Sequence, residues 1–119
     1  QADGLILLRE ENLSAHRRFL RNEGWVVANS RPDKGEIPPF PVHTVDADGI
    51  AREGRNPQGA NLVLLGFLLA RLGPVGEGGA FFCGPSDLRG ALARRFEGKG
   101  DLLAMSLEAM ALGMLHGSR

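Results

Sequence analysis

The side chains that most often bind metals are few in this chain and far apart in its sequence. His16, His43 and His116 are the only histidines, and none stands at ligand spacing from another histidine or from the single cysteine, Cys83. Because a zinc site gathers several such ligands, we predict no metal site here. We expect His16 on a helix face and His43 on a strand that faces water or a partner.

Cys83 is the one candidate for thiol chemistry. A cysteine reacts as the thiolate, which needs a base or a positive charge beside it, and its sequence neighbours supply neither. We therefore interpret Cys83 as a buried structural residue. A lone cysteine cannot form an internal disulfide, which favours the reducing cytoplasm as the location.

Paired carboxylates occur twice, at Glu10 with Glu11 and at Asp46 with Asp48. Solvation explains the first pair, and helix capping by Asp46 or Asp48 explains the second. Neither pair indicates acid–base catalysis, so we predict no catalytic residue in this chain.

Two further groups could meet an anionic ligand. Arg94, Arg95 and Lys99 form a basic group, although these charges also suit the carboxyl end of an exposed helix. The segment Gly76 to Gly79 reads GEGG, but a phosphate loop normally lies between a strand and a helix, and an apolar segment, Ala80 to Cys83, follows instead. We interpret GEGG as a plain turn.

The rest of the chain is arranged around the segment Ala60 to Leu72, which reads ANLVLLGFLLARL. Its apolar residues would cover every side of a helix, so we predict a helix in the middle of a layered domain. Asn61 would bring an amide into apolar surroundings and would need a hydrogen-bond partner. Gly66 indicates close approach of another backbone. These two are the candidate binding residues, although packing roles explain both.

Strand and helix patterns alternate along the chain. We predict parallel strands in a βαβ unit, and an α/β fold with three layers, α/β/α, and a mainly parallel sheet carrying the central helix. The predicted strands are Gly4–Leu8 (buried on both faces), Trp25–Ala28 and Val42–Val45, and the predicted helices are Leu13 to Gly24, Gly49–Arg52, Ala60–Leu72, Pro85–Phe96 and Leu102–Leu115, with a surface loop over Ser30–Pro41.

The totals exclude several classes of partner. The chain has 119 residues, which we expect to form a single domain, 1–119. Fourteen basic side chains balance fourteen acidic ones and tyrosine is absent, which argues against a nucleic-acid or membrane partner.

Several of these segments together resemble a known family, the gamma subunit or domain of the 2-oxoacid:acceptor oxidoreductases, which act on pyruvate, 2-oxoglutarate or indolepyruvate with ferredoxin. The resemblance lies in Val45, Ile50, Ala51, Gly54, Asn56, Asn61 and Leu65-Gly66, then in Phe96, Gly98, Lys99, Leu103, Leu107, Ala109 and Gly113. The chain lacks the family's glycine-rich GxGGxG loop, so it resembles the C-terminal two-thirds of such a domain. It also has Ser106 where the family often has asparagine.

The resemblance implies a gamma-type component of a complex that oxidatively decarboxylates a 2-oxoacid to an acyl-coenzyme A. Thiamine diphosphate, Mg and iron–sulfur clusters would be held by alpha, beta and ferredoxin-like subunits, with coenzyme A as co-substrate and this chain shaping its approach. The chain would form hetero- or homo-oligomers. The alternatives are a non-catalytic interaction or regulatory module and, third, a small nucleotide-binding domain using Gly76 to Gly79.

Overall fold

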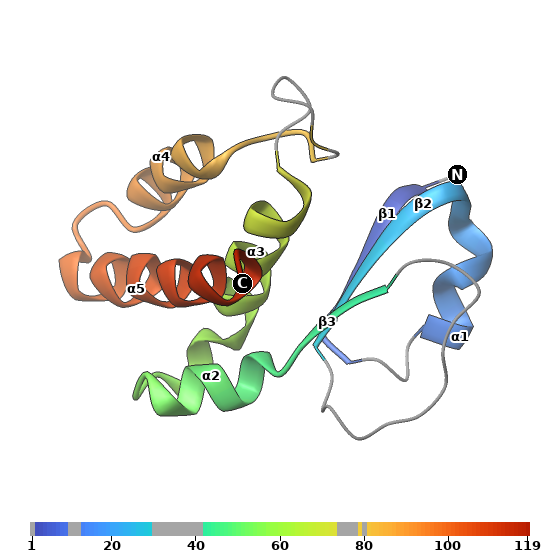
Figure 1. Ribbon diagram of the computed structural model, residues 1–119. Helices are drawn as coiled ribbons and strands as arrows, with labels where there is room; N and C mark the ends of the chain where they lie inside the picture. Colours follow the sequence, from blue (N-terminus) through green and yellow to red (C-terminus); the bar gives the residue numbers. More distant parts are fainter. Residues whose placement is uncertain (1, 10–12, 30–41, 74–78, 80) are drawn as a thin grey trace. The chain divides into compact units, whose positions relative to one another are not determined.

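A computed structural model of the chain describes residues 2–9, 13–29, 42–73, 79 and 81–119 (Figure 1). The chain forms two compact units, residues 1–47 and residues 48–119. The first holds the strands, and the second holds most of the helical structure. The predicted loop Ser30–Pro41 lies outside the described residues, as does GEGG apart from Gly79.

The first unit contains a three-stranded sheet in the order β1-β2-β3. Its strands are β1 (Ala2–Leu7), β2 (Leu20–Asn29) and β3 (Val42–Val45). Both neighbouring pairs are parallel. The α/β class and the parallel sheet are thus confirmed, and β3 has its predicted bounds.

The core of this unit forms on one face of the central strand, β2. Val26 and Ala28 are buried there together with Leu7 of β1, and Leu13 and Leu20 pack against them. Val27, which alternates to the other face of β2, is also fully buried. Both faces of β2 are therefore buried at this point, which explains why Val26, Val27 and Ala28 are all apolar.

The prediction that the first strand is buried on both faces is wrong. β1 lies at the edge of the sheet, and Ile6 is 43% exposed while Leu7 is buried. An edge strand has one neighbour only, so its apolar residues are covered less completely than those of β2.

The predicted helix from Leu13 to Gly24 is also largely wrong. Only a short α1 (Leu13–His16) and a 3-10 turn η2 (Arg17–Phe19) form before β2 begins at Leu20. Leu20 pairs with Ala2 of β1 and packs on the sheet core. This strand pairing extends β2 back into residues whose local spacing suited a helix.

Asn29, at the carboxyl end of β2, fixes the start of the next helix, α2 (Ala47–Glu53). Its Oδ1 accepts a hydrogen bond from the backbone N–H of Ala47 at 2.9 Å, and its Nδ2 donates to the carbonyl of Leu8 at 3.2 Å. The first N–H groups of a helix have no partner within the helix, so the Asn29 amide acts as a remote cap.

The second unit is built on α3 (Ala60–Leu72) and α5 (Gly100–Gly117), which lie in contact (Figure 1). The bounds of α3 are those predicted, and Val63, Leu64 and Leu68 are completely buried. The helix ends at Gly73, whose φ of 67° suits glycine. Its predicted packing on the sheet stays a prediction.

Glycines let the backbones of α3 and α5 touch. A Cβ atom placed on Gly66 of α3 would overlap the carbonyl oxygen of Met110, and one on Gly113 of α5 would overlap the carbonyl oxygen of Val63. At Gly117, one turn later, a Cβ atom would lie 2.6 Å from an α3 carbonyl oxygen. The predicted close backbone approach at Gly66 is therefore confirmed, with α5 as the neighbour.

The bounds of the last two helices differ slightly from the prediction: α4 is shorter than predicted and α5 extends further at both ends. α4 (Pro85–Arg95) ends one residue before the predicted bound, and its Arg89, Arg94 and Arg95 are exposed. The apolar residues of α5 are only partly buried. Met110 is buried, whereas Met105 and Leu115 are exposed, because the contact with α3 is narrow.

Replacing Gly113 by alanine should destabilise the chain, although alanine usually favours a helix. The added methyl group meets a backbone oxygen of α3 that cannot move alone, so we expect Gly113→Ala to lower the free energy of unfolding by at least about 2 kcal/mol in urea titrations. Gly90→Ala in α4 is the control, because the nearest atom would be 3.7 Å away. It should raise stability by about 0.5–1 kcal/mol. Equal effects at the two sites would contradict the described contact.

Candidate functional site

The turn after α2 holds an arginine in an unfavourable backbone conformation. The N–H groups of Arg55 and Asn56 bond the carbonyls of Arg52 and Ala51 at 3.0 and 2.9 Å, the pattern of a Schellman helix end. Arg55 has a φ of 60°, at the position where glycine is usual. A side chain there costs about 1 kcal/mol, and such strain is common at functional sites.

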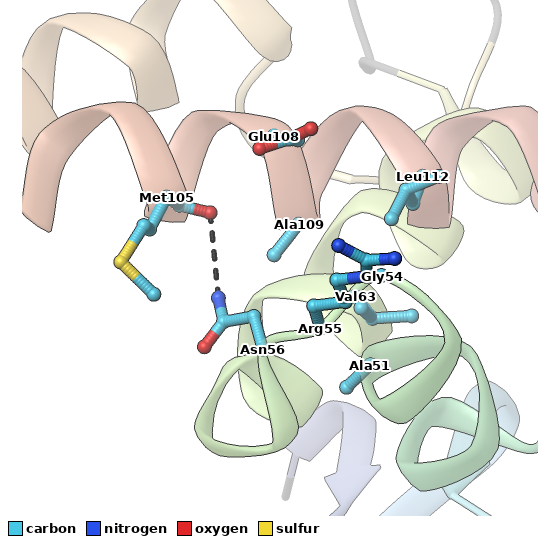
Figure 2. Close-up of a pocket in the computed structure, with 9 residues that line it drawn as sticks. All are labelled: Ala51, Gly54, Arg55, Asn56, Val63, Met105, Glu108, Ala109 and Leu112. Carbon is cyan, nitrogen blue, oxygen red and sulfur yellow. Dashed lines mark hydrogen bonds between the residues drawn. The ribbon is translucent and has the colours of Figure 1, made fainter. Parts of the chain in front are cut away.

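A cleft of about 320 Å³ lies between this turn and α5 (Figure 2). Its apolar surfaces come from α2, α3 and α5, and its polar groups come from the turn and from α5. The lining residues are Ala51, Gly54, Arg55, Asn56, Val63, Met105, Glu108, Ala109 and Leu112. This is the size of a small ligand site, with a few polar groups over an apolar floor.

The polar groups of the cleft come from opposite sides. Figure 2 shows the Arg55 side chain rising from the turn toward α5, while Glu108 projects from α5 itself. The Asn56 Nδ2 donates a long hydrogen bond of 3.5 Å to the carbonyl of Met105, which ties the turn to α5. The cleft can thus offer a guanidinium, a carboxylate and an amide oxygen to a polar partner.

The cleft has no nucleophile paired with a base. Its titratable side chains are Arg55 and Glu108, and both are exposed. Across the described residues, no group of three His, Cys, Asp or Glu side chains could hold a metal ion. One cysteine in the whole chain also falls short of the four thiolates that an iron–sulfur cluster usually needs.

The structure separates the two predicted candidate residues. Asn61 is exposed in the first turn of α3, so the expectation of apolar surroundings is wrong. That turn projects beyond the buried part of the helix, which begins at Val63. Gly66 lies in the α3–α5 contact, where backbone atoms leave no room for a ligand. The binding role that we expected as a possibility for Asn61 and Gly66 stays a prediction.

The other sequence candidates lie on separate elements. His16 is exposed on α1, His43 lies on β3 and His116 on α5. Arg94 and Arg95 are exposed at the carboxyl end of α4, where they suit the helix dipole.

Cys83 is half-buried rather than fully buried. Burial raises the pKa of the Cys83 thiol above its ordinary value, and the Asp87 carboxylate raises this pKa further. Little thiolate is therefore present at neutral pH, which agrees with the structural interpretation. Asp87 itself accepts a hydrogen bond from the N–H of Gly84 at 2.9 Å and so caps α4.

Sequence reasoning missed Arg55, Glu108 and Asn29. The only sequence signal for Arg55 was the position of Gly54. A glycine normally occupies the left-handed position at the end of a helix, but here the glycine stands one residue too early and Arg55 occupies that position. Glu108 resembles any solvated helix residue, and the Asn29 cap joins positions 18 residues apart. Neither has a local sequence pattern.

Comparison with protein families gives one match over almost the whole chain. A family model described as pyruvate ferredoxin/flavodoxin oxidoreductase matches residues 1–115. No curated protein matches the chain.

Solved structures of other proteins share the fold. One is 2-oxoglutarate:ferredoxin oxidoreductase from Magnetococcus marinus with 2-oxoglutarate, coenzyme A and succinyl-CoA bound, with a TM-score of 0.72 and 20% identity over 98% of this chain. Another is the gamma subunit of keto/oxoacid ferredoxin oxidoreductase from Geobacter sulfurreducens PCA, with a TM-score of 0.76 and 17% identity over 98% of this chain. This chain spans 20% of the first protein chain and 64% of the second.

Replacing Arg55 by glycine should stabilise the chain. Glycine adopts a φ of 60° without strain, so we expect Arg55→Gly to raise the free energy of unfolding by about 0.5–1 kcal/mol. Arg52→Gly, within α2, should instead lower it by about 1 kcal/mol. Urea titrations of both variants give the comparison, and a destabilised Arg55→Gly protein would refute the strained conformation.

The Cys83 thiol should alkylate slowly near neutral pH. Because its pKa is raised, the thiolate fraction at pH 7 is smaller than that of a free cysteine, and the iodoacetamide rate should climb only at higher pH. Asp87→Asn removes one cause of the raised pKa and should speed alkylation at fixed pH. Asp101→Asn in α5 is the control and should leave the rate unchanged. A thiol more reactive than free cysteine at pH 7 would contradict this account.

Proposed function

We propose, from the premise that this chain belongs to the pyruvate ferredoxin/flavodoxin oxidoreductase family, that it serves as a gamma-type component of a 2-oxoacid:ferredoxin oxidoreductase complex. The complex would convert a 2-oxoacid to an acyl-coenzyme A by oxidative decarboxylation and pass the electrons to ferredoxin. The family match over residues 1–115 is the observation that carries the proposal. Likeness in fold to a gamma subunit supports the type of component.

The cofactors are assigned to partner subunits. Thiamine diphosphate with Mg and the iron–sulfur clusters would supply the decarboxylation and electron-transfer chemistry from alpha, beta and ferredoxin-like chains. The single cysteine of the sequence fits that division, because an iron–sulfur cluster usually takes four thiolates.

This chain's own part would be assembly, with one side shaping the approach of coenzyme A. The rigid α3–α5 pair supports such a role, since glycine contacts hold the two helices in one arrangement. Within the described residues, no helix has both the length and the apolar character needed to span a bilayer. We place the complex in the cytoplasm on the strength of the lone cysteine.

Reconstitution tests this proposal. The tagged chain would be co-expressed with thiamine-dependent and ferredoxin-like subunits from the same genome. Ferredoxin reduction that depends on a 2-oxoacid would then be measured with and without coenzyme A. We expect the chain in a stoichiometric complex, and turnover close to background when it is omitted. Gly90→Ala should support full turnover, because the added methyl group would lie no nearer than 3.7 Å to another atom.

The outcomes separate the alternatives. Subunits that assemble and turn over fully without the chain would refute the proposal. Co-purification with no effect on turnover would identify a non-catalytic interaction module instead. Heat on titration with millimolar ATP or NAD would favour the nucleotide-binding alternative, which uses Gly76 to Gly79.

A further inference from the structure

The cleft beside α5 holds two side chains of opposite charge that do not pair with each other. Arg55 comes from the turn after α2 and Glu108 from α5, and both are exposed (Figure 2). Neither forms an ion pair with any residue that the structure describes. The guanidinium and the carboxylate are thus too far apart to neutralise each other, and each is able to bind a group that a ligand brings.

Apolar side chains form the floor and one side of the same cleft. Ala51, Val63 and Ala109 are buried in the floor. Met105 lies at the side and is 43% exposed, so its side chain is accessible to a ligand. The volume of about 320 Å³ is at the lower end of the range for small-molecule sites. The cleft therefore suits a small ligand that has an apolar part as well as charged groups.

The signs of the two charges limit the class of ligand. A phosphate or a simple carboxylate would be attracted by Arg55 and repelled by Glu108, and a simple amine would meet the reverse combination. A zwitterion satisfies both, because its carboxylate pairs with the guanidinium while its ammonium donates to the Glu108 carboxylate. None of the described residues that line the cleft is aromatic, which argues against a nucleotide base as the apolar part.

We propose that this cleft binds a free α-amino acid with an apolar side chain, such as leucine. Its carboxylate pairs with Arg55, its ammonium pairs with Glu108, and its side chain contacts the apolar surfaces. Such binding gives a function to the Arg55 side chain, at a position where glycine would be less strained. Because the charges are exposed and the ligand is small, we expect a dissociation constant of roughly 0.1–1 mM. The inference rests on the cleft alone and does not depend on the function proposed above.

Calorimetric titration of the full chain tests the proposal with three ligands that share one branched side chain but differ in charge. Leucine carries both charged groups, its 2-oxoacid lacks the ammonium, and isopentylamine lacks the carboxylate. We expect leucine to bind at least about fivefold more tightly than either analogue, because each analogue leaves one charged group of the cleft without a partner. In NMR spectra, leucine should shift the backbone amide signals of Arg55, Asn56 and Glu108.

Matched variants test whether the cleft is the binding site. Arg55→Gln should remove most of the advantage of leucine over the amine, and Glu108→Gln most of its advantage over the 2-oxoacid. Both side chains are exposed, so circular dichroism should stay that of the wild type. Arg89→Gln and Glu97→Gln remove the same charges at exposed sites outside the cleft and should leave leucine binding unchanged.

Three results would overturn the proposal. The first is the absence of leucine binding up to about 20 mM, well above the expected dissociation constant. The second is a 2-oxoacid or an amine that binds as tightly as leucine, which would show that the two charges do not act together. The third is leucine binding that is unchanged in both Arg55→Gln and Glu108→Gln, which would place the ligand elsewhere on the chain.

Discussion

The second unit depends on how closely two backbones approach. Gly66 on α3 and Gly113 and Gly117 on α5 leave no space for a methyl group, so the helices touch through main-chain atoms rather than through interdigitated side chains. Leu64, Leu68 and Met110 fill the space around that contact and are completely buried or nearly so. Because side chains that change rotamer cannot relax such a contact, the two helices hold one relative position.

The cleft follows from this constraint. With its glycine face against α3, α5 presents Met105 and Ala109 toward the end of α2, and Asn56 bonds the α5 backbone at that point. The turn between α2 and α3 then has little freedom, and Arg55 takes a left-handed conformation that glycine would adopt at lower cost. The polar groups of the cleft are therefore placed by helix packing, and none of them belongs to a catalytic constellation.

Elements with a continuous apolar sequence, or with a glycine or proline at their ends, could be predicted from the sequence. The bounds of α3 follow from its largely apolar sequence and from Gly73, and β3 and the parallel sheet followed from their patterns. Features set by distant partners could not be predicted. The pairing of Leu20 with Ala2 replaced an expected helix with strand, and the Asn29 cap joins β2 to the start of α2. The sequence indicated that another backbone lies close to Gly66. It could not indicate that Asn61 is exposed, because that depends on where neighbouring elements begin to cover α3.

Native-state hydrogen exchange tests the α3–α5 constraint most directly. If the backbone contact holds the unit together, the amides of Leu64 and Leu68 in α3 and of Met110 in α5 should exchange only through one shared opening, with the same free energy and the same dependence on denaturant. Exchange of the α3 amides through a smaller, separate opening, while the Met110 amide stays protected, would contradict the account.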